Sequence, residues 1–305
     1  MILLSLVGEQ PIPNLLPLWQ FPQYDEVQFA ASPTTRAVAQ QLKTAMQNDP
    51  LLQRIQPLKT LELGAYDIHD ARARLAAALV EHQAKGKSVH LNLTGGTKLM
   101  SLAALQAAFG SGITLMYVST EEKTIIWLGS DGSEQRREPI RVKISVAQYL
   151  NAHGLQIEDK VNPFSAPPPK EGDDLEQEVE RLLRSSGDFD DVRRNVHTLL
   201  KRGKKAVRNE LDLVVTRNGR LAVISCKSGT VESVTGRDSY KKAIYELSTI
   251  SRREAAGIYC GKVLVSSQME LPEAIRSRAL ESNVRLVYGA EVKHVCRHVL
   301  AALGE

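Results

Sequence analysis

Short apolar runs alternate with stretches of helical periodicity along the first half of the chain. The apolar runs predict strands at residues 2–7, 58–63, 89–93, 113–118 and 123–128. Helical spacing of apolar positions predicts helices at residues 34–47, 68–85 and 98–109. The last two strands are close enough to pair as a hairpin. Strands that alternate with helices indicate a mostly parallel α/β sheet, whose ligands gather at the carboxyl ends of the strands.

The second half continues this pattern, beginning with a predicted helix at 173–185 that has acids in its first turn and arginines in its last. Strands predicted at 211–216 and 221–225 are separated by Arg217-Asn218-Gly219-Arg220. Asn-Gly between apolar runs is a strong hairpin signal. Helices at 239–253, 272–282 and 290–303 then alternate with strands at 262–266 and 285–288, so this half is also predicted to be α/β.

A proline-rich segment separates the two halves. Prolines neither continue a helix nor donate to a sheet, so residues 161–172 are predicted to form an extended linker. A chain of 305 residues is long enough for about two domains. We therefore predict one domain at residues 1–160 and another at 173–305, joined by a linker at 161–172.

The composition is that of an average soluble protein, with 43% hydrophobic and 24% charged residues. This balance excludes a disordered chain, a collagen-like chain and a disulfide scaffold. Cys226, Cys260 and Cys296 are scattered and form no CxxC pair, which argues against a zinc ribbon. No apolar run approaches the ~20 residues of a membrane span, and the first residues lack the features of a signal peptide. The sequence predicts a cytoplasmic protein with no membrane partner.

The net charge of +4 arises entirely in the second half of the chain. Residues 1–169 carry 15 basic and 15 acidic residues, whereas residues 170–305 carry 24 and 20. Between positions 192 and 209 there are seven basic residues and no acid: Arg193, Arg194, Lys201, Arg202, Lys204, Lys205 and Arg208. A one-sign stretch attracts phosphates by counterion release, which makes it a candidate nucleic-acid contact. A solvated basic loop is the alternative.

Two glycines stand at a turn from strand to helix, in the segment Thr94-Gly95-Gly96-Thr97-Lys98. Glycine lets backbone amides approach a ligand closely, and a helix N-terminus offers free N–H groups to an anion. The segment matches neither the P-loop nor the dinucleotide-binding pattern. It predicts a phosphate or nucleotide site, and a tight structural turn remains the alternative.

A second loop supports this site, because Gly8, Gln10 and Asn14 follow the first predicted strand. In an α/β sheet both loops can lie on one edge. The amides of Gln10 and Asn14 are able to read the edges of bases. On these residues alone, a surface loop made rigid by its prolines is an equally good explanation.

The segments LVGEQPIPNLLP and LNLTGGTKLMSLAAL together resemble the CARF domain, the Rossmann-like sensor of type III CRISPR ancillary proteins, over roughly residues 1–150. The resemblance implies a homodimer that binds a cyclic oligoadenylate, usually cyclic tetra-adenylate, across the dimer axis. A two-fold ligand suits such an axis because each subunit offers the same patch. The implied ligand contacts are Gly8, Gln10, Asn14, Thr94, Gly95, Gly96, Thr97 and Lys98.

Carboxylates and a lysine are brought together by the predicted hairpin of the second half. Strand alternation places Glu210 and Asp212 on one face of their strand, and Ser225 and Lys227 on one face of the next. Glu176 on the preceding helix could supply a further carboxylate. Clustered carboxylates hold Mg²⁺ or Mn²⁺, which polarises a phosphodiester, while a lysine stabilises developing charge. A surface strand pair with ordinary charges is the alternative.

This arrangement resembles the PD-(D/E)xK, or restriction-endonuclease-like, superfamily over about residues 173–300. The resemblance implies that Glu176 and Asp212 are the metal ligands and that Ser225-Cys226-Lys227 corresponds to the (D/E)xK motif. The sequence departs from the family at Ser225, which cannot match the charge of a carboxylate.

Three explanations of this departure are open. Glu210 could replace the missing carboxylate from the neighbouring strand. A helix acid, Glu246 or Glu180, could enter the site instead. The site could also work with fewer protein ligands, or it could be degenerate.

The two resemblances together predict a homodimeric nuclease of CRISPR antiviral defence that cuts DNA or RNA endonucleolytically. Cyclic tetra-adenylate would activate it allosterically, and Mg²⁺ or Mn²⁺ would be its cofactor. The candidate catalytic residues are Asp212, Lys227, Glu176, Glu210 and Ser225. One rival hypothesis is a ligand-responsive nucleic-acid-binding protein with a dead nuclease site. Another is a sensor half that slowly cleaves its own ligand.

Overall fold

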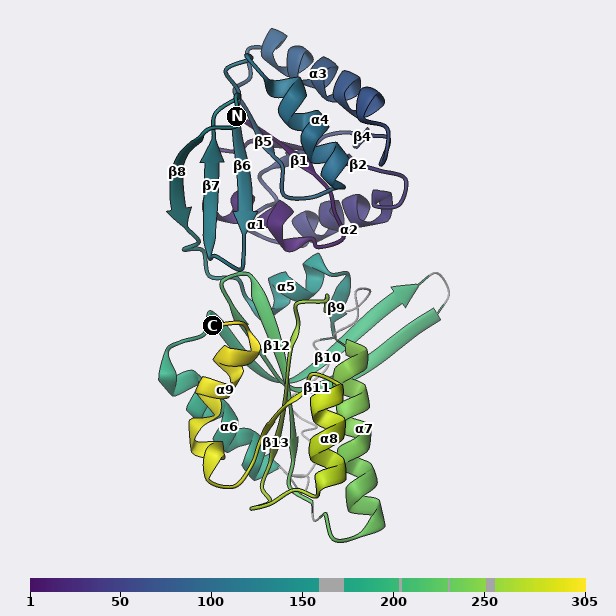
Figure 1. Ribbon diagram of the computed structural model, residues 1–305, viewed down its shortest axis with the longest axis vertical. Helices are drawn as coiled ribbons and strands as arrows, with labels where there is room; N and C mark the ends of the chain where they lie inside the picture. The colour runs from purple at the N-terminus through teal and green to yellow at the C-terminus, as the bar shows by residue number, and fades with distance from the viewer. Residues whose placement is uncertain (159–172, 203–204, 230, 251–255) are drawn as a thin grey trace. The chain divides into compact units, whose positions relative to one another are not determined.

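The computed structural model describes residues 1–158, 173–202, 205–229, 231–250 and 256–305 (Figure 1). Contacts within the chain divide it into two compact units, Met1–Val142 and Lys143–Glu305. Each unit is built on its own β-sheet.

The sheet of the first unit has parallel strands in its centre and an antiparallel extension at one edge. The strand order is β3-β2-β1-β5-β6-β7-β8, and β4 also pairs with β2. The pairs among β1, β2, β5 and β6 are parallel, whereas β7 and β8 are antiparallel additions. The strands are β1 (Ile2–Leu6), β2 (Glu26–Ala31), β3 (Gln56–Pro57), β4 (Leu61–Glu62), β5 (Val89–Asn92), β6 (Thr114–Ser119), β7 (Thr124–Leu128) and β8 (Glu134–Pro139). The predicted Rossmann-like α/β class is confirmed for this unit.

Four helices cover this sheet: α1 (Ile12–Gln20), α2 (Arg36–Gln47), α3 (Ile68–Ala84) and α4 (Lys98–Ala108). Helices α3 and α4 lie side by side (Figure 1) and pack over the alternate β1 residues Ile2, Leu4 and Leu6. The buried residues of both helices are mostly Ala and Leu, whose apolar surface is removed from water at this interface. This packing holds the N-terminus of α4 at the carboxyl edge of the sheet.

Helix α1 occupies residues that the sequence predicts as a loop. Pro11 is its N-cap residue, and Pro13 lies in its first turn. The first N–H groups of a helix have no partner within it, so proline is compatible with these positions. Pro11 and Pro13 therefore mark the start of a helix, and within the predicted loop of residues 7–14 the prediction is wrong only for residues 12–14.

The second unit is built on the sheet β14-β13-β12-β11-β10-β9. Its strands are β9 (Leu155–Ile157), β10 (Asp191–Arg202), β11 (Lys205–Arg217), β12 (Arg220–Lys227), β13 (Gly261–Ser266) and β14 (Arg285–Val287). The strands from β9 to β12 pair antiparallel, and β12, β13 and β14 pair parallel. Asn218 and Gly219 both have positive φ, 50° and 76°, as the predicted hairpin turn requires.

The helices of this unit are α5 (Val146–Ala152), α6 (Asp173–Ser186), α7 (Val234–Ile250), α8 (Glu273–Glu281) and α9 (Val295–Ala302), with the 3₁₀ helix η1 (Gly289–His294) before α9. A core of Val179 and Leu183 from α6 and Val295 and Val299 from α9 packs on the sheet. Helices α7 and α8 lie next to each other (Figure 1). The single helix predicted at 290–303 is observed as two pieces, η1 and α9.

The contacts place residues 143–157 in the second unit, whereas the sequence predicts them in the first domain. Helix α5 packs against β9 and β11, and β9 pairs with β10. The proline-rich linker predicted at 161–172 lies outside the described residues. Among the described helices, none is long and apolar enough to cross a membrane.

Candidate functional site

Asp212 lies on β11 where its pairing with β12 ends. The last paired residues before this point are Leu213 and Ile224. Beyond them, Oγ of Ser225 donates a hydrogen bond to Oδ2 of Asp212 at 2.9 Å, and the backbone N–H of Cys226 donates to the same oxygen at 2.8 Å. Two donors therefore hold the Asp212 carboxylate in one orientation.

The pairing of β11 with β10 is also interrupted at Asp212. The ladder passes from the pair Arg194–Leu213 to the pair Val196–Leu211 without a change of register, so Asn195 lies opposite Asp212 although the two are not paired. Asn195 has a φ of 54°, in the left-handed region that Asn adopts more readily than most residues. This backbone conformation accompanies the gap in the ladder beside Asp212.

Three charged residues lie close enough to Cys226 to affect the pKa of its thiol. Burial raises this pKa most, the carboxylates of Asp212 and Glu176 raise it further, and the ammonium of Lys227 lowers it. A buried thiol of raised pKa stays protonated and is a poor nucleophile. Asp212, Glu176 and Lys227 are therefore all within electrostatic range of Cys226, and Cys226 itself is inert.

Lys227 is the last residue of β12, and Tyr240 of α7 holds the backbone beside it. The Tyr240 hydroxyl lies 3.2 Å from the carbonyl oxygen of Lys227, 3.1 Å from that of Gly229 and 2.7 Å from Oγ of Ser266. The side chain of Tyr240 is 1% exposed, so Tyr240 positions the lysine strand and touches no ligand.

Two of the three acids considered as replacements for a carboxylate at Ser225 have ion-pair partners of their own. Glu180 forms ion pairs with two arginines, one on α6 and one on β10. Glu246 pairs with a lysine of its own helix, and its side chain is 62% exposed. Glu210 is exposed, pairs with His197 of β10 and shares a strand face with Asp212, so it stays a candidate. Asp212 and Glu176 are the carboxylates whose charges reach Cys226.

A divalent metal fits these two carboxylates. Mg²⁺ keeps several waters and is usually held by one or two carboxylates together with substrate phosphates. Within the described residues, the hydrogen bonds of Asp212 fall on Oδ2, which leaves Oδ1 for a metal. The described residues contain no group of three or more His, Cys, Asp or Glu that could hold a metal. The arrangement suits a metal shared with the substrate and does not suit a closed structural site.

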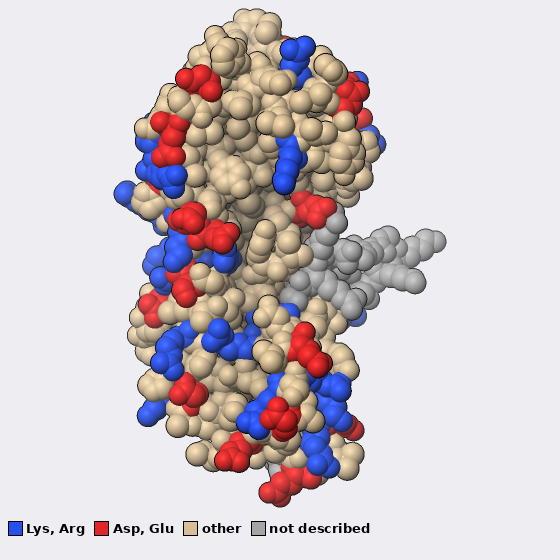
Figure 2. Space-filling view, in the orientation of Figure 1, with Lys and Arg blue, Asp and Glu red and all other residues tan. Residues whose placement is uncertain are grey.

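The basic stretch forms paired strands of β10 and β11, so it is not a loop (Figure 1). Three of its arginines are matched by carboxylates, each about 3.0 Å away: Arg193 by Asp191, Arg194 by Glu180 and Arg208 by Glu158. The side chains of Lys201, Arg202 and Lys205, and all of Lys204, lie outside the described residues. On the face in view, Figure 2 shows Lys and Arg interspersed with Asp and Glu.

The two loops selected as a ligand site meet at the carboxyl edge of the first sheet, because β1 and β5 are parallel neighbours. A Cβ on Gly95 would stand 2.0 Å from the carbonyl oxygen of Leu6. A Cβ on Gly8 would stand 3.1 Å from the backbone nitrogen of Gly96, which has a φ of 79°. The loops therefore pack backbone against backbone, and only glycine permits this approach at Gly95.

Asn14 is buried beneath these loops and ties them together. Its Oδ1 accepts a 3.0 Å hydrogen bond from Oγ of Ser5, and Nδ2 of Asn92 donates to the same Ser5 hydroxyl at 3.1 Å and to the carbonyl oxygen of Pro13 at 2.9 Å. With 0% exposure, Asn14 offers no group to a ligand in this conformation. Sequence reasoning missed Ser5 and Asn92; polar residues inside apolar strands were the available signal.

Some of the other selected residues use their polar groups inside the protein, and others keep donors that are not used there. The Thr94 hydroxyl donates to Oδ1 of Asn92 at 2.6 Å, and the Thr97 hydroxyl donates to the carbonyl oxygen of Ala65 at 2.6 Å while capping α4. Lys98 is exposed at the start of α4. Nε2 of Gln10 is buried with no hydrogen-bond acceptor in the described part of the chain. Lys98, Gln10 and the first N–H groups of α4 are thus the donors left for a ligand.

Comparison with known protein families identifies both units. A model of the Card1 CARF domain matches residues 2–149, and a model of the Card1-like endonuclease domain matches residues 170–303. The two matches define a sensor domain followed by an endonuclease domain. The chain belongs to the CRISPR-associated nucleases that carry a CARF domain, and its second unit has the endonuclease fold of that family.

Solved structures share this architecture at low sequence identity. Can2 from Sulfobacillus thermosulfidooxidans, in complex with cyclic tetra-adenylate, is 18% identical with a TM-score of 0.76, and the similarity covers 100% of this chain and 99% of that one. Protein VC1899 from Vibrio cholerae is 16% identical with a TM-score of 0.75 over the same shares. A type III CRISPR defence DNA nuclease activated by cyclic oligoadenylate is 16% identical with a TM-score of 0.62, over 94% of this chain and 48% of that one. No curated protein matches the chain.

Proposed function

We propose that the protein is a metal-dependent endonuclease of type III CRISPR defence that cyclic tetra-adenylate activates. The observation that carries the proposal is the Asp212 carboxylate, oriented by Ser225 and Cys226 at the end of β12, with Glu176 and Lys227 in electrostatic range of the same place. The endonuclease family of this unit supports phosphodiester cleavage as its reaction.

Asp212 and Glu176 are the residues that would hold Mg²⁺ or Mn²⁺. When bound, such a metal supplies Lewis-acid polarisation of the phosphodiester and a water of lowered pKa. Lys227 contributes a positive charge where negative charge develops on the phosphate oxygens. Ser225 has no charge to offer, so its part is to donate to Asp212 and fix the position of Oδ2.

Cyclic tetra-adenylate would bind at the carboxyl edge of the first sheet. Lys98, Gln10 and the N-terminus of α4 offer donors to its phosphates, while Gly8, Gly95 and Gly96 allow the backbone to come close. Thr94, Thr97 and Asn14 position these loops. The fold shared with Can2, which carries this ligand in its structure, supports the choice of ligand.

Two copies of the chain would share one ligand, because a two-fold ligand presents the same groups to each subunit of a homodimer. The basic residues Lys201, Arg202, Lys204 and Lys205 would contact the DNA or RNA substrate. Arg193, Arg194 and Arg208 already have carboxylate partners and contribute less. Activation requires that the ligand bind the cleaving state of the dimer more tightly than the resting state.

The test is cleavage of labelled single- and double-stranded DNA and RNA, with Mg²⁺, Mn²⁺ or EDTA, in the presence and absence of cyclic tetra-adenylate. We expect cleavage that needs both metal and ligand and that Asp212→Ala abolishes. Cleavage that persists in EDTA, or full activity of Asp212→Ala, would contradict the proposal. Cyclic tri- and hexa-adenylate serve as controls for ring size.

A second candidate function is a ligand-responsive nucleic-acid binder with no nuclease activity, which the serine at position 225 favours. This function predicts binding that depends on the ligand, without cutting, and that does not respond to a chelator. The cleavage experiment therefore separates the two candidates directly.

A further inference from the structure

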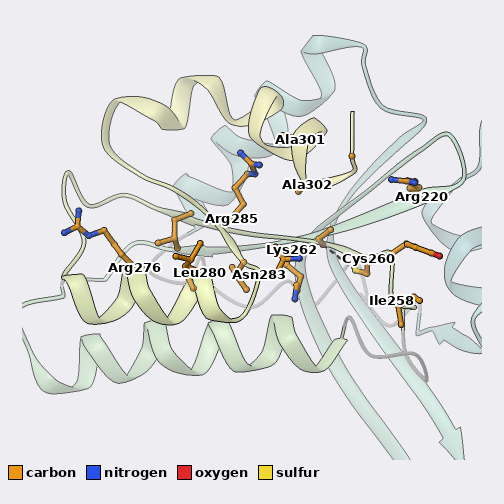
Figure 3. A pocket seen from close by; sticks show the side chains of 16 residues that line it. Arg220, Ile258, Cys260, Lys262, Arg276, Leu280, Asn283, Arg285, Ala301 and Ala302 are labelled. Atoms are coloured by element: carbon orange, nitrogen blue, oxygen red, sulfur yellow. Dashed lines mark hydrogen bonds between the residues drawn. The ribbon is translucent and has the colours of Figure 1, made fainter. Parts of the chain in front are cut away.

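A cavity of about 550 Å³ lies in the second unit, away from Asp212 and Lys227. It is lined by the first residues of β12, β13 and β14 and by the ends of α8 and α9 (Figure 3). Arg220, which lines the cavity, is the first residue of the eight-residue strand β12, and Lys227 is the last. The length of this strand, roughly 23 Å, therefore separates the cavity from the candidate active site. Its volume is within the usual range for small-ligand sites.

The charge of this cavity is one-sided. Arg220, Lys262, Arg276 and Arg285 are among the described residues that line it, and none of those residues is acidic. Arg276 pairs with Glu273 of its own helix. In the described part of the chain, neither Arg220, Lys262 nor Arg285 forms an ion pair with a carboxylate. Three uncompensated cations around one cavity favour an anionic ligand.

Arg220 is built into the cavity wall with a donor unused. Its Nη1 donates to the carbonyl oxygen of Leu303 at 2.7 Å, and its Nε is buried with no acceptor among the described residues. A Cβ at Gly304 would stand 2.5 Å from Nη1, so this glycine leaves the room that the guanidinium occupies. Held in this way, the Arg220 guanidinium is a fixed positive charge in the cavity wall, which favours an oxyanion beside it.

Lys262 and Arg285 complete the cationic part of the wall (Figure 3). Nζ of Lys262 donates to the carbonyl oxygen of Ser282 at 2.6 Å, at the C-terminal end of α8. Partial burial lowers the pKa of Lys262, and a bound anion would favour its charged form. Arg285 is exposed at the first position of β14 and can move toward a ligand.

Apolar and aromatic side chains form the rest of the rim. Ile258, Tyr259 and Leu280 line the cavity and are 58%, 56% and 82% exposed. Exposed apolar groups beside uncompensated cations suit a ligand with a flat ring and a phosphate. Cys260 also lines the cavity, but burial raises the pKa of its thiol to about 12, so the wall offers binding and no thiolate chemistry.

We propose that this cavity binds a nucleoside phosphate, with the phosphate held by Arg220, Lys262 and Arg285 and the base resting on Tyr259 and Leu280. The ligand is either a free nucleotide or the phosphorylated end of a nucleic-acid strand, since both present the same chemistry. This site is distinct from the candidate active site and from the proposed cyclic tetra-adenylate site, and it does not depend on either of them.

The test is a binding titration with the full chain in EDTA, so that no strand is cut. The probes are adenosine 5′-monophosphate and a fluorescent tetranucleotide with either a 5′-phosphate or a 5′-hydroxyl. We expect Arg285→Ala to weaken binding of at least one phosphate probe tenfold or more, and Lys262→Gln to do the same. The matched control is Arg181→Ala, which removes an exposed arginine of α6 and should leave affinity within twofold of the wild type.

The pattern of probes identifies the source of the ligand. Loss of affinity for the monophosphate alone assigns the site to free nucleotides, and loss for the 5′-phosphorylated strand alone assigns it to strand ends. Equal affinity of wild type, Arg285→Ala and Lys262→Gln for every probe would overturn the proposal. Loss that is as large for the 5′-hydroxyl strand would also overturn it, because the terminal phosphate would then not be recognised. Unchanged thermal unfolding of Arg285→Ala, whose side chain is exposed, guards against a folding defect.

Discussion

The hydroxyl of Ser225 donates a hydrogen bond of 2.9 Å to Oδ2 of Asp212, at the position where the related nuclease motif has a carboxylate. The serine therefore acts on the neighbouring acid and cannot hold a metal with a charge of its own. The backbone N–H of Cys226 makes a second bond to the same oxygen. Ser225 and Cys226 therefore orient the carboxylate, and Asp212 is the residue that carries the charge.

We expect Ser225→Ala to lower the rate of cleavage about tenfold, because it removes one charge-assisted hydrogen bond of about 1.5 kcal/mol while Cys226 still orients Asp212. Asp212→Asn should remove activity entirely, since the neutral amide cannot attract a metal. Initial rates with saturating ligand and metal measure both. If Ser225→Ala were as inactive as Asp212→Asn, the serine would have a direct part in the chemistry.

Tyr240→Phe should slow cleavage with little change in KM. The hydroxyl anchors the backbone at Lys227 and the side chain of Ser266, so its loss leaves the lysine less well placed. The free energy of unfolding should fall by about 1 kcal/mol, as expected for one buried hydrogen bond. Tyr245→Phe is the matched control, because Tyr245 is on the same helix and is 57% exposed. Equal activity of the two variants would contradict a positioning role for Tyr240.

Gly95→Ala should abolish binding of cyclic tetra-adenylate, whereas Gly8→Ala should weaken it less. A Cβ added at Gly95 would lie 2.0 Å from the carbonyl oxygen of Leu6, so the loop would have to move. A Cβ added at Gly8 would lie 3.1 Å from its nearest neighbour, the backbone nitrogen of Gly96, which requires a smaller shift. Calorimetric titration with cyclic tetra-adenylate gives both affinities. Wild-type affinity in Gly95→Ala would show that the ligand does not need the close approach of the two loops.

Acid should destabilise both units, the first through the partly buried His90 and the second through the buried His153. Burial lowers the pKa of His90 to about 4, with a further contribution from Arg136, and burial alone lowers that of His153 to about 4, from an ordinary 6.5. At pH values between about 4 and 6.5, each of these histidines binds a proton in the unfolded chain but not in the folded chain. The free energy of unfolding is therefore not reduced by these groups above pH 6.5, and it decreases as the pH falls toward 4.

Urea titrations at pH 7.5 and pH 5 measure this loss of stability. The decrease should be smaller in His90→Gln, which removes one of the groups that titrates. An equal decrease in wild type and His90→Gln would show that His90 has no part in the acid sensitivity.

Local signals in the chain were sufficient for many elements. The Asn218-Gly219 turn, the Gly95-Gly96 turn and the alternating pattern before each were visible because they depend on residues near in sequence. The strands β2, β8, β9 and β10 and the helices α1 and α5 were not predicted. Helix α1 was hidden by prolines that its first turn tolerates, and β8 is a mostly exposed edge strand with little apolar pattern.

The candidate site shows the same division. Spacing alone grouped Asp212 with Lys227 and Ser225, because strand alternation is a local property. It could not show that Glu180 is held by two arginines or that Asn14 is buried against Ser5, because these contacts join residues from separate elements. It also could not reveal the cationic cavity, whose walls come from β12, β13, β14, α8 and α9.

The amino-acid sequence by itself determined the α/β class of both halves, the glycine turn and the acid–lysine motif with its missing carboxylate. Only the tertiary structure decided which polar side chains face a ligand and which are used inside the protein. The physical reason is that burial and hydrogen-bond partners depend on segments distant in the chain. A buried amide such as Asn14 must satisfy its donors and acceptors within the fold, and it then has none to offer outside.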